Sequence, residues 1–159
     1  MLTNNIVADN QATTASGMFV SESSPHLLHT TIARNSAGDG WGIHVVSSSS
    51  VTLTNTILVG HSVGIYVEAG SSASLDATLW GSGAWANSTD WSGGGTVTAG
   101  NDVEGDPAFV DPDNGDYHIG PSSAAIDTGV NAGVTTDIDG EGRPSGAGYD
   151  IGADEWVPQ

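Results

Sequence analysis

The sequence contains no cysteine and no lysine, and Arg34 and Arg143 are its only basic residues. Without cysteine the chain forms no disulfide, no thiolate metal site and no cysteine nucleophile. Nineteen acidic residues oppose the two arginines, so the formal net charge is −17. Nucleic acid is excluded as a partner because phosphate binding needs clustered basic side chains. The sequence also has no apolar run of about 18 residues, so no membrane insertion is expected.

Helix-forming residues are scarce, whereas glycine, β-branched residues and small polar residues are common. Glycine alone accounts for 23 of the 159 residues. Such a composition favours strands and turns over helices. The sequence therefore predicts an all-β fold.

Two short segments recur along the first half of the chain. The first is nine residues long, begins with leucine and occurs at 2–10, 27–35, 53–61 and 75–83. The second is GMFV, GIHV and GIYV, which begin at Gly17, Gly42 and Gly64. Polar and apolar residues alternate within them, as in β-strands. The spacing of 22 to 26 residues predicts a solenoid, namely a right-handed parallel β-helix of about four coils.

The composition changes near residue 100. Residues 1–99 contain six acidic residues, whereas residues 100–159 contain thirteen and none of the repeats. We therefore expect coils in 1–99 and an irregular, acidic C-terminal cap in 100–159 that covers the last coil. Residues 2–10 already form a complete repeat, so the N-terminal end is expected to be uncapped and to self-associate through residues 1–35.

The C-terminal sequence carries a recognisable pattern, which is GDPAFVDPDNGDYHIGPSSAAIDTG at 105–129, TDIDGEGRP at 136–144 and YDIGADEW at 149–156. It resembles the closing segment of bacterial surface proteins built on right-handed parallel β-helix repeats. That segment is a choice-of-anchor-type module, similar to the ends of polymorphic outer-membrane-like proteins. The resemblance implies secretion or display on the cell surface, and it implies no defined enzymatic activity.

The acidic loops of the C-terminal part are candidates for binding Ca²⁺. Asp137, Asp139 and Glu141 alternate in DIDGEG, and Asp150 and Asp154 follow shortly after. Carboxylates spaced in this way could direct several oxygens at one hard cation. The glycine falls too early for an EF-hand loop. The alternative is that these carboxylates cap turns without any metal.

Several other polar residues are expected to have structural roles. Arg143 is the one basic residue of the C-terminal part, and we expect it to form an ion pair with Asp150 or Asp127. Asn10, Asn35 and His61 occupy the same position of successive repeats. Stacked coils would bring their side chains within hydrogen-bonding distance of one another.

Aromatic residues suggest a surface that could contact carbohydrate. Phe19, His44 and Tyr66 share one position of the second repeat and are expected to form an outward row. Trp85 and Trp91 are further candidates in or near loops. The alternative is a structural row of contacts between coils.

The favoured function is a non-catalytic structural or adhesion module, the C-terminal part of a larger extracellular or cell-surface β-helix protein with a possible glycan or cell-surface ligand. The alternatives are a carbohydrate-binding protein and, less favoured, a polysaccharide-degrading enzyme. Degradation of a polyuronate needs basic groups that grip the substrate, and the two arginines are far apart in the sequence.

Overall fold

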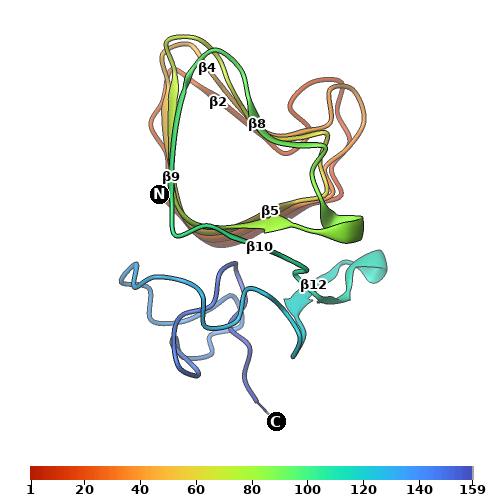
Figure 1. The fold of residues 1–159 in the computed structure, drawn as a ribbon, viewed down its shortest axis with the longest axis vertical. Helices are drawn as coiled ribbons and strands as arrows, with labels where there is room; N and C mark the ends of the chain where they lie inside the picture. The colour runs from red at the N-terminus through yellow and green to blue at the C-terminus, as the bar shows by residue number, and fades with distance from the viewer. Residues whose placement is uncertain (159) are drawn as a thin grey trace.

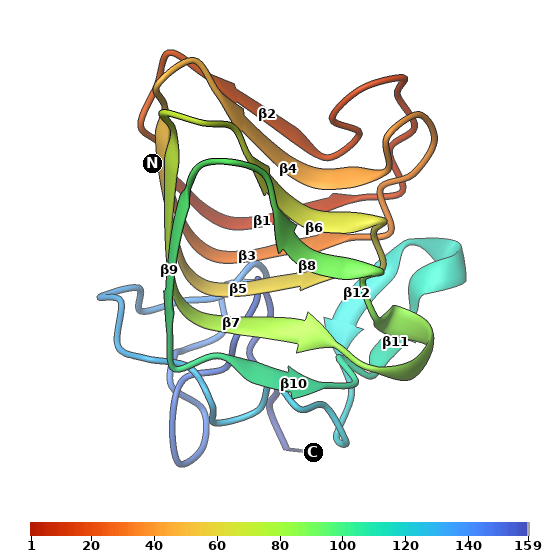
Figure 2. The ribbon, with the colours of Figure 1, turned by 45° about the horizontal axis from the view of Figure 1, so that its top comes forward.

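The computed structural model describes residues 1–158, and in it parallel sheets stack into a solenoid of about four turns (Figures 1 and 2). The predicted all-β parallel β-helix is thereby confirmed. The first sheet has the order β1-β3-β5-β7-β10, with β9 also paired to β7. Its strands are β1 (Leu2–Ala8), β3 (His26–Ala33), β5 (Ser50–Val59), β7 (Ser72–Gly81), β9 (Thr96–Gly100) and β10 (Val103–Gly105).

The second sheet closes the other side of each coil and has the order β2-β4-β6-β8. Its strands are β2 (Met18–Ser21), β4 (Trp41–Val46), β6 (Val63–Val67) and β8 (Thr89–Ser92). The helices are two short 3-10 turns, η1 (Gly83–Trp85) and η2 (Pro112–Asn114). Within the described chain, no helix is long and apolar enough to cross a membrane.

The sequence repeats correspond to coils, because equivalent residues pair in register. The leucines that open the first repeat form one such column, Leu2, Leu27, Leu53 and Leu75. Glycine recurs in the second repeat because neighbouring coils approach closely there. A Cβ atom on Gly17 would lie 2.2 Å from the carbonyl oxygen of Gly42, and one on Gly42 would lie 2.6 Å from that of Gly64. Any larger residue would push the coils apart.

One corner of every coil is formed by a residue in the left-handed backbone conformation. These residues are Asn4, His29, Asn55, Ala77 and Asn101. Asparagine adopts this conformation more readily than most residues, which accounts for three of the five. The corner bends each long strand into two halves. In β7, the first half pairs with β9 and the second half with β10.

The second half of β5 is buried on both faces. In β5, Leu58 belongs to the cluster inside the solenoid, whereas Ile57 and Val59 belong to a second cluster outside it. That outer cluster includes Tyr117 and Ile151 from the C-terminal part of the chain. A parallel strand buried on both faces reads as a continuous apolar run, and the TILV segment of β5 is such a run.

The residues that follow β10 form the C-terminal module (106–158), whose regular structure is the antiparallel pair β11 (Phe109–Asp111) and β12 (Asp116–Ile119) together with η2. The strands of the solenoid thus continue to Gly105, beyond residue 99. We expected this part of the chain to cover the last coil. It packs instead along the flank of the first sheet, and Figure 1 shows it outside the superimposed coils, next to β5 and β10.

Hydrogen bonds join the C-terminal module to successive coils. Asn4 Nδ2 donates to the carbonyl oxygen of Thr136 at 2.7 Å in the first coil. The amide of Ala153 donates to Thr31 Oγ1 at 3.1 Å in the second coil. In the third coil, Asn55 Nδ2 donates to the carbonyl oxygen of Val130 at 2.7 Å, and Asn55 Oδ1 accepts from the Val130 amide at 2.8 Å. The module therefore acts as a brace along the solenoid.

Substitution of Gly152 tests this brace. Gly152 has a φ of +107°, and a Cβ atom on it would lie 2.6 Å from Ile57 Cδ1. Gly133 has a φ of +76° with no atom within 4 Å of such a Cβ. We expect Gly133→Ala to cost about 1–2 kcal/mol of unfolding free energy through backbone strain alone. Gly152→Ala should cost about 1–3 kcal/mol more because it also overpacks the interface.

The measurement is urea unfolding of the parent and the two variants. Equal losses for Gly152→Ala and Gly133→Ala would contradict a tightly packed flank.

Candidate functional site

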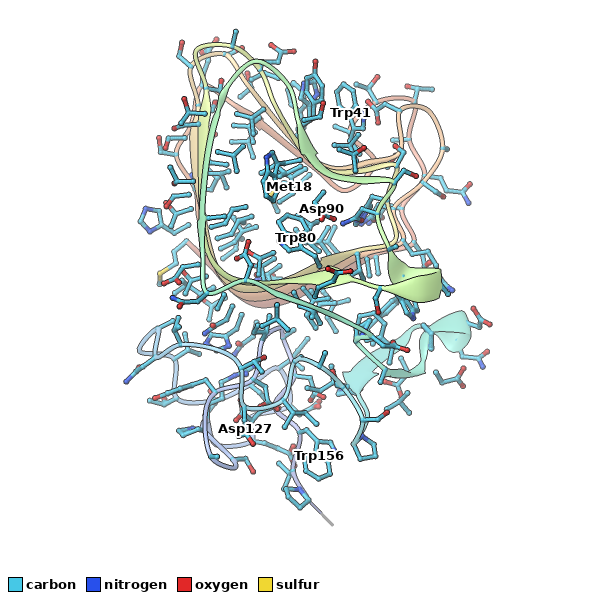
Figure 3. The ribbon with its side chains drawn as sticks, in the orientation of Figure 1. Met18, Trp41, Trp80, Asp90, Asp127 and Trp156 are labelled. Carbon is cyan, nitrogen blue, oxygen red and sulfur yellow. The ribbon has the colours of Figure 1, made fainter. Side chains whose placement is uncertain are left out.

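Three of the five predicted carbohydrate-contact residues lie side by side on the second sheet. Phe19, His44 and Tyr66 occupy paired positions in β2, β4 and β6. Trp41, which Figure 3 labels, joins them. Its ring is stacked on that of Tyr66 at a centroid distance of 4.1 Å and an interplanar angle of 5°. The His44 ring stands edge-on to Trp41 at 4.6 Å. These four residues form the aromatic patch. His44 was expected to face outward, but it is only 7% exposed because the rings of Phe19, Trp41 and Tyr66 surround it. The recurrence of one repeat position identified three of them, and Trp41 lies three residues before that position, directly before Gly42.

The other two predicted residues lie elsewhere. Trp85, in η1, packs edge-on against Phe109 of the C-terminal module at 4.9 Å. Trp91 continues the inward-facing column of Ile65 in β8 and packs against Trp80 at 5.8 Å. Trp91 is 46% exposed because the coil it belongs to is the last in its sheet. Neither tryptophan extends the aromatic patch.

The column of Asn10, Asn35 and His61 forms a hydrogen-bonded ladder along a second corner. Asn10 Nδ2 donates to Asn35 Oδ1 at 3.0 Å, and Asn35 Nδ2 lies 3.3 Å from His61 Nε2. Asn87 extends the ladder, since its Oδ1 accepts from the His61 amide at 2.9 Å. Burial lowers the pKa of His61 to about 4, so the ring is neutral and can accept from Asn35. The ladder links four coils.

Asp137 and Asp150, two of the four predicted metal ligands, hold the backbone of the C-terminal module. Asp137 Oδ1 accepts from the amides of Asp139 at 3.0 Å and Glu141 at 2.8 Å, and Asp137 Oδ2 accepts from the amide of Glu155 at 3.2 Å. The carboxylate of Asp150 accepts from two further amides at 2.7 and 2.8 Å. Burial raises the pKa of Asp150 to about 6. These oxygens are therefore already satisfied by peptide groups.

Arg143 is buried in an ion pair with Glu155. Its Nη1 atom lies 2.8 Å from Glu155 Oε2, and neither side chain is exposed. We expected Asp150 or Asp127 as the acidic partner, and this expectation is wrong. Asp150 contributes only its carbonyl oxygen, at 3.3 Å, because its carboxylate and that of Asp127 accept from backbone amides. Glu155 has the longer side chain, and it also accepts from the amide of Ser145 at 2.7 Å.

Asp139 is the one predicted metal ligand that meets other ligand-type side chains. His118, Asp139 and Asp154 each place one ligand atom within 4.8 Å of the others. They line a pocket of about 620 Å³ in the C-terminal module, with Glu141 on the same wall. Asp154, 15 residues from Asp139 in the chain, was noted as a nearby carboxylate, whereas His118 was missed because it lies 21 residues away. The only signal was a histidine two residues after the acidic segment DPDNGD (111–116).

His118 is held by carboxylates on both ring nitrogens. Nδ1 lies 2.5 Å from Asp116 Oδ1, and Nε2 lies 2.6 Å from Asp139 Oδ2. Burial alone would lower the pKa of His118, but these two hydrogen bonds outweigh it and raise the pKa to about 9. The ring is therefore an imidazolium at neutral pH, enclosed by negative charge.

Comparison of the chain with protein-family models, with curated proteins and with solved structures finds no match.

The buried ion pair gives a sharp prediction. Glu155→Gln should lower the unfolding free energy by about 3–5 kcal/mol, because it leaves the Arg143 guanidinium buried without a countercharge. Glu104→Gln removes one charge from an exposed position of β10 and should change stability by less than about 0.5 kcal/mol. Urea unfolding measures both. A loss for Glu155→Gln no larger than that for Glu104→Gln would contradict the structural role of the pair.

The ladder predicts a loss of stability in acid. The pKa of His61 is about 4 in the folded chain, whereas its ordinary value is 6.5. Between pH 4 and pH 6.5, His61 is therefore protonated in the unfolded chain but not in the folded chain. The contribution of His61 is complete above pH 6.5 and falls by roughly 2 kcal/mol on going to pH 5. His61→Asn restores the residue found at the other ladder positions and should remove this loss.

Unfolding of the parent and His61→Asn at pH 7 and pH 5 measures the difference. Subtracting one chain from the other cancels groups such as Asp150, whose raised pKa acts in the opposite direction. Parallel pH profiles of the two chains would count against a neutral, buried His61.

Proposed function

We propose that the chain is a non-catalytic structural or adhesion module of a larger extracellular or cell-surface protein. The observation that carries this proposal is the brace along the solenoid, in which the C-terminal module bonds to one coil after another. Such an arrangement gives a stiff rod with side chains presented at regular spacing along its outer faces. The resemblance of the C-terminal sequence to the closing segments of bacterial β-helix surface proteins supports the proposed location.

The positions of the two basic residues support a non-catalytic role. Arg143 is buried against Glu155. Arg34 lies 2.6 Å from Asp9 Oδ1 and 2.7 Å from Asp113 Oδ1, so it ties the first two coils to the C-terminal module. Both arginines therefore serve the fold, and neither is free to grip an acidic sugar.

A second candidate is carbohydrate binding by the aromatic patch. Phe19 is 57% exposed, and the stacked pair of Trp41 and Tyr66 lies beside it. Flat aromatic faces pack against the apolar faces of sugar rings and are a common feature of glycan-binding surfaces. Stacked coils repeat this surface about every 4.8 Å, so an extended glycan would run along the coils.

The two candidates are separated by affinity electrophoresis of the intact chain through gels containing neutral or acidic polysaccharides, with release of reducing ends followed in parallel. We expect no release. If the aromatic patch binds glycan, one of the gels should retard the chain, and Phe19→Ala/Tyr66→Ala should lose the retardation. Trp91→Ala is the matched control, because Trp91 is exposed but lies outside the aromatic patch.

Retardation that survives in Phe19→Ala/Tyr66→Ala would contradict the patch as the glycan site. Release of reducing ends by the purified chain would overturn the non-catalytic proposal.

Self-association through residues 1–35 stays a prediction, and β1 is the outermost strand of its sheet.

A further inference from the structure

The three residues of the His118 cluster come from separate segments of the C-terminal module. His118 lies in β12, Asp139 lies in the loop that follows Asp137, and Asp154 lies near the C-terminal end. Folding of the module brings their ligand atoms within 4.8 Å of one another. Within residues 1–158 this is the one group of three or more such side chains with this geometry.

We propose that His118, Asp139 and Asp154 bind one divalent transition-metal ion, of which Zn²⁺ is the representative. The site differs from the all-oxygen Ca²⁺ site expected from the sequence, because Asp137 and Asp150 are occupied by backbone amides and an imidazole takes part. An imidazole nitrogen with carboxylate oxygens suits Zn²⁺ and its neighbours, whereas Ca²⁺ prefers oxygen ligands alone.

Asp116 orients the imidazole for this task. Its Oδ1 accepts from His118 Nδ1, which turns Nε2 toward Asp139. Metal-bound histidines usually donate their second N–H to a carboxylate in this way, which fixes the ring and makes the other nitrogen a better donor to the metal. To bind M²⁺, Nε2 must offer its lone pair to the ion, and a proton carried on Nε2 is released to solvent in that step.

Asp154 is a buried carboxylate that the protein only half satisfies. Asp154 is 6% exposed, and its Oδ2 accepts from the amide of Ile119 at 2.8 Å. Among the residues that the structure describes, none donates a hydrogen bond to Oδ1, and Asp154 lines the pocket. Asp137 and Asp150 are equally buried, yet both of their oxygens accept from amides. Asp154 Oδ1 therefore has no hydrogen bond to lose and is available to an ion that enters the pocket.

The pocket leaves room beside the ion. An apolar part of its wall is formed by Val110, Pro121 and Trp156, the last of which is labelled in Figure 3. This apolar wall keeps the charged groups partly out of water. Three protein ligands leave at least one position of a tetrahedral ion for water or for an acidic group of a partner. A divalent ion at this position would place positive charge between the carboxylates of Asp139 and Asp154. The ion therefore relieves the repulsion between the two carboxylates.

Titration calorimetry of the full chain with ZnCl₂ tests the site, and CaCl₂ is titrated in parallel. The variants are His118→Asn, Asp139→Asn and Asp154→Asn. Exposed residues provide matched controls, His26→Asn for the imidazole and Glu104→Gln for the carboxylate. Far-UV circular dichroism checks that each variant folds. Addition of Co²⁺ to the parent, read by its visible absorption, reports on nitrogen ligation without any substitution.

We expect one equivalent of Zn²⁺ to bind and to raise the melting temperature. Each ligand variant should weaken binding by about 10- to 100-fold or more, while the two controls bind as the parent does. Absence of saturable Zn²⁺ binding would overturn the proposal. Equal weakening in the control variants would also overturn it, because it would show that the net charge alone attracts Zn²⁺. Tighter binding of Ca²⁺ than of Zn²⁺ would overturn it as well. Glycan binding and polysaccharide release are measured separately, so failure of this site leaves the proposed function untouched.

Discussion

Burial of the outer face of the first sheet is the constraint on which the rest of this structure depends. Ile57, Val59 and Leu79 point away from the interior of the solenoid, and they are fully buried only because the C-terminal module covers them. A solenoid without that cover would expose a continuous apolar stripe across its coils. The module must therefore follow the flank for most of the length of the solenoid, and its hydrogen bonds to Asn4, Thr31 and Asn55 are spaced accordingly.

This constraint also explains why the acidic residues are concentrated after residue 100. The C-terminal module has little regular secondary structure, so its buried amides lack the partners that a sheet or helix would provide. Carboxylates supply them instead, and Asp137, Asp150 and Glu155 together accept from seven backbone amides. Much of the negative charge thus serves as main-chain hydrogen-bond acceptors. Charged acceptors are stronger than neutral ones, which suits a segment that must hold a fixed shape without strands.

The sequence predicted the coils well because each coil repeats the same local requirements. Leucine at the inward position, glycine at the close approach and asparagine at the corner all recur at the period of one turn. The placement of the C-terminal module was not predictable in this way. It depends on which sheet has apolar residues on its outer face as well as on its inner face. The apolar run TILV in β5 was available as a signal, but alternation elsewhere in the strand concealed it. Glu155 and His118 were missed because neither belongs to a repeat, and their partners lie 12 and 21 residues away in the chain.

The aromatic patch and the His118 cluster belong to opposite sides of the molecule. The patch lies on the second sheet, whereas the cluster lies in the module that covers the first sheet (Figures 1 and 3). The coils between them are held by in-register hydrogen bonds and by the ladder of Asn10, Asn35 and His61. The two surfaces share no residue, and the paired coils of the solenoid lie between them. An ion at the cluster would therefore stabilise the brace without altering the patch, so the two surfaces can serve separate ligands on one rod.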